Sequence, residues 1–374
     1  MEAAGTTPRV GPDLSDLAEV IDGSGPFLTL YLLTDGEVDN AGSRSEQRWK
    51  TLRRQLAGDG APESALALVD PLVGDAHLSG AMLSVVADAS RVLLVEHLDD
   101  PLDQDRCCWG RLPDLAPLIR WRQSQLPYVL ALADHGGADL IAERPGRSNL
   151  ERTAGDGDPQ RKVSPGGWSQ QRYQQRADND WANTAADVAG QVAQLSEAVD
   201  ARIIILGGDG RATHMIRDDL GPELAQRTHI IDQGRAADGS EEARIQEVRR
   251  LVASAVAEDT VALIEKFKEE RGQHDRAAEG AEATIDALNR VAVDVLLVHD
   301  DRQGTAWVGE QAVPIGMDDA PSGTAEGERA DEATLTDALV RAAIGTGASV
   351  RIIPDAGPVQ DGIGALLRWS NPTT

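Results

Sequence analysis

The sequence predicts a mixed α/β fold in three domains: an N-terminal α+β domain (1–127), a central α/β domain (128–275) and a small C-terminal α/β sandwich (280–374). Strand-like runs of Val, Ile and Leu alternate with helical patterns along the chain, which indicates sheets layered with helices. The length of 374 residues exceeds that of one typical core. A stretch without apolar periodicity, 144–176, interrupts the central domain, and so long a loop is usually functional or disordered.

The N-terminal domain is predicted to begin with a short helix after Asp13, whose side chain suits an N-cap. The elements expected after it are a strand at 27–33, a helix at 43–56, strands at 82–86 and 91–96, and a helix at 115–125. The helix at 43–56 is basic, with Arg44, Arg48, Lys50, Arg53 and Arg54. This face is either solvated or placed to meet phosphates.

The central domain is predicted to open with a hairpin, because strand-like runs flank a His-Gly-Gly turn. Apolar residues at helical spacing run from Trp181 to Val199, and the polar turns before them should project beyond the domain. The elements expected after this helix are a strand at 202–206, a turn at 207–210, a helix to 224, a strand at 229–232 and a helix at 241–271. The Gly-Gly-Asp-Gly turn lacks the G-x-G-x-x-G pattern, so we interpret it as a turn and not as a nucleotide site.

The C-terminal domain is predicted to alternate helix and strand. The expected elements are a helix at 283–291, strands at 294–298 and 306–308, a mobile loop at 313–330, a helix at 331–344, a strand at 350–354 and a closing segment at 362–369. Such alternation favours a small α/β sandwich.

Composition restricts the possible functions. A net charge of −26 argues against a surface that coats nucleic acid uniformly. The neighbouring Cys107 and Cys108 are expected to be free thiols in a reducing compartment. With no signal pattern and no apolar run of about 20 residues, we expect a cytoplasmic protein without a membrane or DNA partner. The histidines lack metal-ligand spacing and the chain lacks nucleophile-elbow and phosphate-loop motifs, so neither a metal nor a cofactor is expected.

The long polar segment is locally positive in a negative chain. Between 144 and 176 there are seven basic and three acidic residues. Arg161, Lys162, Arg172 and Arg176 suit RNA phosphates. The residues between them have other properties that suit RNA: glycines that allow close backbone approach, an indole that stacks on an unpaired base, and polar groups for base edges or sugars, namely Gly166, Gly167, Trp168, Ser169, Gln170 and Gln171. The alternative is a disordered, solvated loop with Trp168 folded back as an anchor.

Several stretches together resemble the archaeo-eukaryotic class I release factor and Pelota superfamily, in its bacterial branch. They are YVLALADHGGADLIAE from Tyr128, GGWSQQRYQQR from Gly166, ARIIILGG from Ala201, DVLLVHD from Asp294 and GIGALLRW from Gly362. The Gly-Gly segment before a long helix is the most specific of them. The N-terminal domain matches the superfamily only in its placement.

The resemblance implies a translation factor whose central loop enters the peptidyl transferase centre from the ribosomal A site, with rRNA as its contact and elongation factor Tu as a possible partner. Release factors carry Gly-Gly-Gln there, whereas Trp168 follows Gly166 and Gly167 in this chain. This departure fits a hibernation factor similar to Balon better than a hydrolase. Peptidyl-tRNA hydrolysis of the Vms1 type, with Gln170 or Gln171 orienting the water, stays open, as does an acidic stress protein that binds a protein partner.

Overall fold

The computed structural model divides into two compact units, Met1–Gln123 with Thr260–Thr374 (unit 1) and Ser124–Asp259 (unit 2). It describes residues 12, 14–22, 25–34, 41–74, 76, 80–134, 137–145, 149–154, 170–232, 241–273, 275–300, 304–317, 330–355, 357 and 359–370; the side chains of residues 41 and 170–181 lie outside this description. The predicted division into three domains is finer than these two units and stays a prediction.

Unit 1 contains an antiparallel sheet of order β3-β2-β1-β4 in its N-terminal part. Its strands are β1 (Phe27–Leu33), β2 (Met82–Ala87), β3 (Val92–Leu98) and β4 (Arg106–Gly110). Two helices, α2 (Ala41–Gly58) and α3 (Glu63–Val73), bury apolar side chains against one face of this sheet. The apolar stripe of α3 is short and contains Pro71, and the sequence patterns did not identify this helix.

The C-terminal part of unit 1 holds a second sheet, of order β10-β16-β11-β15. Its strands are β10 (Ala277–Glu279), β11 (Val293–His299), β15 (Ser349–Ile353) and β16 (Ile363–Leu367). The helices α9 (Ala281–Asn289) and α10 (Leu335–Gly345) cover one face. On the other face lie Leu263 and Phe267 of the long helix α8 (Glu241–Gly272).

A smaller sheet of order β13-β12-β14 completes the C-terminal part. Its strands are β12 (Thr305–Val308), β13 (Ile315–Gly316) and β14 (Asp331–Thr334). The predicted start of a helix at 331 is therefore wrong, because β14 pairs with β12 before α10 begins at Leu335. A short 3₁₀ helix, η2 (Gln360–Gly362), precedes β16.

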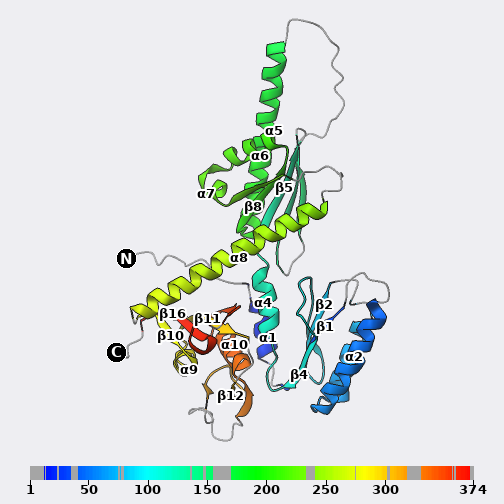
Figure 1. Cartoon of the computed structure of the whole chain (residues 1–374), viewed down its shortest axis with the longest axis vertical. Helices are drawn as coiled ribbons and strands as arrows, with labels where there is room; N and C mark the ends of the chain where they lie inside the picture. The colour runs from blue at the N-terminus through cyan, green and yellow to red at the C-terminus, as the bar shows by residue number, and fades with distance from the viewer. Residues whose placement is uncertain are drawn as a thin grey trace. The chain divides into compact units, whose positions relative to one another are not determined.

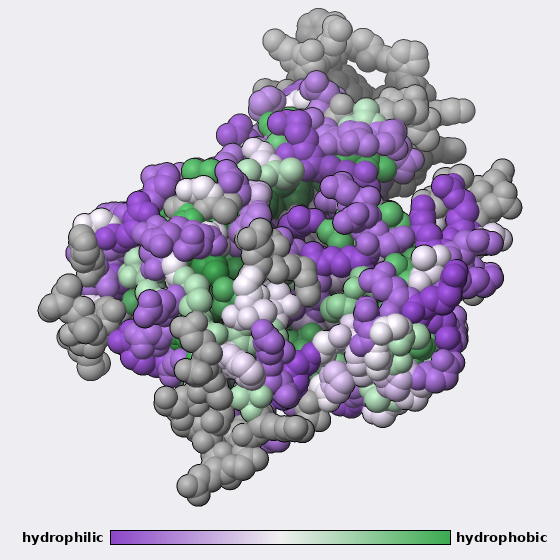
Figure 2. All heavy atoms as spheres, turned by 60° about the horizontal axis from the view of Figure 1, so that its bottom comes forward, coloured by the Kyte–Doolittle hydropathy of each residue, from purple (hydrophilic) through white to green (hydrophobic). Residues whose placement is uncertain are grey.

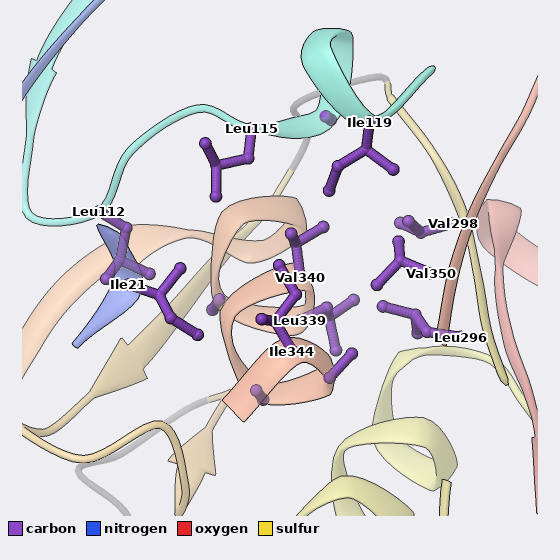
Figure 3. Close-up of a cluster of buried hydrophobic side chains, with 14 of the residues drawn as sticks. Ile21, Leu112, Leu115, Ile119, Leu296, Val298, Leu339, Val340, Ile344 and Val350 are labelled. Atoms are coloured by element: carbon purple, nitrogen blue, oxygen red, sulfur yellow. The ribbon is translucent and has the colours of Figure 1, made fainter. Parts of the chain in front are cut away.

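Segments from both ends of the chain share the core around α10. The helices α1 (Ser15–Ile21) and α4 (Ala116–Ser124) contribute to the same buried cluster as α10 and β11. Figure 3 shows Leu115 and Ile119 on one side of Val340 and Leu339, with Leu296, Val298 and Val350 on another. The N-terminal and C-terminal parts of unit 1 thus form one hydrophobic core.

A buried ion-pair network joins the same two parts of unit 1. The Nη1 of Arg106 lies 2.8 Å from the Oδ2 of Asp300, and its Nε lies 2.5 Å from the Oδ2 of Asp114. Burial alone lowers the pKa of the Arg106 guanidinium, but the two carboxylates raise it above its usual value. The Arg106 guanidinium therefore stays charged at physiological pH, and removal of one of its partners leaves a charge in the interior without that partner.

Unit 2 is built on a mixed sheet of order β7-β6-β5-β8-β9. Its strands are β5 (Tyr128–Asp134), β6 (Gly137–Glu143), β7 (Leu150–Ala154), β8 (Ile203–Gly208) and β9 (Thr228–Ile231). β5 pairs with β6 in antiparallel fashion, as the predicted hairpin requires, and with β8 in parallel. The helix α5 (Gln170–Val199) lies between β7 and β8 in the chain, and α6 (Gly210–Asp219) and α7 (Gly221–Gln226) lie between β8 and β9. The helices α5 and α6 pack against one face of the sheet, and the first half of α8 packs on the other.

The predicted α/β class is confirmed, together with most of its helices and strands. The structure adds β4, β7, β10, β13 and β14, which the sequence patterns did not reveal, and β13 lies in the expected loop 313–330. β7 and the first residues of α5, from Gln170, lie within the stretch 144–176, which we expected to be loop. Only the ends of β7 are partly or fully buried, so it lacks the apolar alternation that identifies a strand from sequence.

Candidate functional site

The candidate site is the end of unit 2 from which α5 extends. The described buried residues of α5 form one stripe, which includes Ala185, Val188, Val192 and Leu195, and they pack on the sheet and α6. Figure 1 shows the N-terminal turns of α5 extending past the edge of this sheet. The C-terminal part of the helix is therefore anchored, while its first turns lead away from the sheet.

The hairpin of β5 and β6 supports α5 where the helix leaves the sheet. Asp134 pairs with Gly137 at the end of the hairpin. These two residues and Thr184, Ala185 and Val188 of α5 line a small cavity, which Ala212 and Ile216 of α6 complete. The cavity has room for about one water molecule, so it suits a packing junction and not a ligand.

The turn between β8 and α6 also lies in unit 2, and its own carboxylate occupies the helix N-terminus. The Asp209 side chain accepts hydrogen bonds from the backbone N–H groups of Arg211 and Ala212, at 2.9 and 3.1 Å. Gly208 has φ +117°, and a Cβ there would lie 2.0 Å from the carbonyl oxygen of Ala133. These features confirm the interpretation as a turn, since the cap uses the donors that a phosphate would need.

The predicted RNA-contacting residues lie at the start of α5 and before it. Gln170, Gln171, Arg172 and Arg176 form the first turns of α5, and their side chains are outside the described part of the chain. The other members, Arg161, Lys162, Gly166, Gly167, Trp168 and Ser169, lie outside the described residues. Their assignment as site residues therefore stays a prediction.

A further basic residue of the same segment is described. Arg152 lies on β7 in the exposed part of the strand, and its Nη1 is 3.5 Å from the Oε1 of Gln194 on α5. This polar contact joins the edge strand of the sheet to the helix. The sequence had already placed Arg152 in the positive segment, but it gave no sign that the residue lies on a strand.

The basic helix face of the N-terminal part, on α2, is largely committed to internal contacts. Arg53 pairs with Glu63 and Asp70, and Arg48 donates to the backbone carbonyl of Leu33 at 2.9 Å. Both of these guanidinium groups are thus held by residues of unit 1. These two side chains therefore stabilise unit 1 itself, a role different from both the solvated face and the phosphate contact considered from the sequence.

No group of three or more His, Cys, Asp or Glu side chains in the described part of the chain is arranged to hold a metal ion. Among the described helices, none combines the length and apolar character that crossing a membrane requires.

Comparison with known protein families identifies the part of the chain that contains this site. Residues 127–273 match the family "Bacterial archaeo-eukaryotic release factor family 2". This segment is therefore similar to a bacterial release factor domain, and we refer to it below as the release factor domain. The release factor domain includes the hairpin, α5 and all of α8, so the predicted superfamily is confirmed for the central part of the chain.

Two relatives match almost the whole chain. Two proteins of Mycobacterium tuberculosis, "Uncharacterized protein Rv2629" from strain H37Rv and "Uncharacterized protein MT2704" from strain CDC 1551, are each 26% identical over 366 residues, which is 94% of this chain and 95% of theirs. The similarity therefore includes the regions before and after the release factor domain.

The similar chains among solved structures include archaeal proteins. The structure "Model of ribosome-bound archaeal Pelota and ABCE1" has 15% identity and a TM-score of 0.40, with 99% of each chain covered. Pelota of Archaeoglobus fulgidus has 17% identity and a TM-score of 0.37, with 97% of this chain and 94% of that chain covered.

Proposed function

We propose that this protein is a translation factor that binds the ribosome and occupies the A site with residues 161–176 in the peptidyl transferase centre. The observation that carries the proposal is the position of α5, whose first residue, Gln170, directly follows the Gly166–Ser169 segment in a release factor domain. From Gln170 to Thr184 the helix spans about 22 Å at 1.5 Å per residue. This length is enough to hold residues 161–176 away from the sheet.

The charge distribution supports RNA as the contact. Seven basic and three acidic residues between 144 and 176 stand against a net charge of −26 for the chain. RNA binding by such a protein needs positive charge concentrated in one place, because the rest of the surface repels phosphates. Binding should therefore weaken steeply as the salt concentration rises.

Co-sedimentation with purified ribosomes tests this proposal. The wild-type chain should pellet with ribosomes at low salt, and Arg172→Ala/Arg176→Ala should weaken binding about tenfold or more. The matched control is Arg249→Ala/Arg250→Ala, which removes the same charge from α8, the helix that packs on the opposite face of the sheet. Absence of co-sedimentation at low salt, or equal losses from both double variants, would reject the proposal.

We further propose that the bound protein is a hibernation factor that protects idle ribosomes, with cytoplasmic, ribosome-associated localisation. The indole of Trp168 stands where a release factor carries its glutamine, and water positioning for hydrolysis depends on sub-ångström placement. Elongation factor Tu is the proposed protein partner on the ribosome. Pelleting assays with and without this factor test that part, and unchanged occupancy would remove it.

Peptidyl-tRNA hydrolysis is the second candidate function, since Gln170 and Gln171 open the first turn of α5 in a release factor domain. A single-turnover assay of peptide release distinguishes the two functions. A hydrolase should release peptide at a rate that Gln170→Ala/Gln171→Ala abolishes without loss of ribosome binding. The hibernation proposal expects no release above the ribosome-only background.

A further inference from the structure

The large exposed apolar side chains of the described residues are few and do not gather on one element. On the face shown in Figure 2, hydrophilic residues cover most of the described surface and hydrophobic ones form small separate areas. The large apolar side chains that are most exposed are Val95, Ile245, Val261, Val291, Met317 and Trp369. Val95, at 40% exposure, is the member of this set that lies on the edge strand of a sheet.

That strand, β3, pairs with β2 on one side and is the last strand of its sheet in the described part of the chain. A strand at an edge presents unpaired backbone N–H and C=O groups, to which another strand can bind. Proteins usually protect such edges with short strands, charges or prolines. β3 has seven residues and begins with four apolar ones in a row, Val92–Val95.

β3 contains one acidic residue, Glu96, which pairs with Arg122, but it is longer than every other edge strand of the described residues. β7 exposes Glu151 and Arg152 at its centre, and β4 begins with the ion-paired Arg106. β9 and β10 have only four and three residues. In β3 the register shift near Val92 shortens the regular ladder, but Leu94–Leu98 keep continuous pairing with β2.

The charges at the two ends of β3 make it complementary to a second copy of itself. Arg91, with a side chain 71% exposed, lies directly before the strand, and Asp99 and Asp100, both exposed, follow it. In an antiparallel pair of two β3 strands, the basic start of each strand lies near the acidic end of the other. Arg91 also lies 3.7 Å from its own Asp88, and Asp99 accepts a hydrogen bond from Trp121, so both ends are held in place.

We propose that β3 is a dimerisation edge, at which two copies of this chain pair their β3 strands in antiparallel orientation about a two-fold axis close to Val95. With the axis at Val95, the valines face each other and Leu94 lies opposite Glu96. An axis at Glu96 would instead place two carboxylates opposite each other, which is unfavourable. The interface is isologous, as a two-fold axis requires, and it is independent of the ribosome-binding proposal.

Sedimentation velocity of the full chain between about 1 and 100 μM tests the dimer directly, because weak interfaces associate in this concentration range. The wild type should self-associate, and Val95→Lys should weaken the dimer about tenfold or more because two like charges then meet at the axis. Ile245→Lys is the matched control, since Ile245 is 37% exposed but lies on α8. A monomeric wild type at the highest concentration, or a dimer that Val95→Lys leaves unchanged, would overturn the proposal.

A cross-linking experiment covers the case in which Val95→Lys disturbs folding. In a Cys107→Ser/Cys108→Ser background, Val95→Cys should form a disulfide-linked dimer under mild oxidation, since facing Cβ atoms lie about 4.5–5.5 Å apart across an antiparallel pair. Ile245→Cys in the same background should remain monomeric. Equal cross-linking of both variants, or none for Val95→Cys, contradicts a two-fold axis at this position.

Discussion

Two helices of this chain, α10 and α5, differ in how much of their surface is buried. Every residue of α10 from Leu335 to Ile344 is buried, because segments from both ends of the chain pack around it. The described side chains of α5 are buried along one stripe only, and Ala182, Asn183, Ala186 and Gly190 are exposed. A helix enclosed on all sides can act only as a core, whereas one held along a stripe can carry a binding segment beyond its sheet.

The largest loss of stability is expected from a cavity created in the core around α10. Leu339 has no exposed surface, so Leu339→Ala should lower the free energy of unfolding by about 3 kcal/mol. Urea unfolding of the full chain measures this change. Ala186→Ser on the exposed side of α5 is the control and should stay within about 0.5 kcal/mol of the wild type.

The same variant tests whether the two ends of the chain share one core. In Leu339→Ala, amide hydrogen exchange should accelerate in both β1 and β11, because both strands belong to unit 1 and border the cluster around α10. Acceleration confined to β11 would mean that the N-terminal sheet is stable independently of α10.

An intermediate effect is expected along the buried stripe of α5. Val192→Ala should lower the stability of unit 2 by about 2 kcal/mol, from lost apolar burial and a small cavity. Hydrogen exchange should accelerate in β5 and β6 and leave β1 unchanged. If Val192→Ala also accelerates exchange in β1, the two units do not unfold separately.

A smaller effect is expected at the cap of α6. Asp209→Ala removes the acceptor for two backbone N–H groups and should cost about 1 kcal/mol. Thermal unfolding monitored by circular dichroism measures it, with the exposed Asp218→Ala as the control. Equal melting temperatures for Asp209→Ala and Asp218→Ala would show that the cap contributes nothing.

The smallest effect concerns reactivity and not stability. Burial is the main reason that the pKa of the Cys107 thiol is raised to about 11, and the nearby carboxylates of Asp59 and Asp105 contribute less. The thiolate is then scarce at pH 8, and its fraction should rise about tenfold per pH unit until the pH approaches this pKa. In a Cys108→Ser background, the rate of iodoacetamide alkylation between pH 8 and 10 should follow that slope. A rate that levels off below pH 9 would show an ordinary thiol.

Sequence patterns predicted the parts of the fold that depend on local periodicity. The stripe of α5 is an example, since it is set by burial of one face of the helix, and the apolar runs of β5 and β6 on the two sides of a glycine turn are another. α3 and β7 were not predicted, because their apolar signal is short or weak and long-range pairing determines them. The shared core around α10 was also not predictable, because residues about 200 positions apart in the sequence meet there.

The sequence predicted the charge and residue types of the candidate site, but not the positions of its residues. The positive charge between 144 and 176 is a property of the residues themselves, and the helical spacing of apolar residues from Trp181 to Val199 predicted the helix that follows the segment. The position of Gln170 as the first residue of α5 came from the structure, because the polar residues before Trp181 have no apolar stripe. The contact between α5 and the hairpin at Thr184 depends on tertiary packing, which no local pattern reports.

Cryo-electron microscopy of ribosomes incubated with the full chain is the most direct test of the ribosome-binding proposal. The proposal predicts density for the release factor domain in the A site, with Gly166–Arg176 in the peptidyl transferase centre and α5 leading back to its sheet. Ribosomes with an empty A site under conditions where the protein is in excess would contradict it, as would a bound protein whose α5 points away from the rRNA.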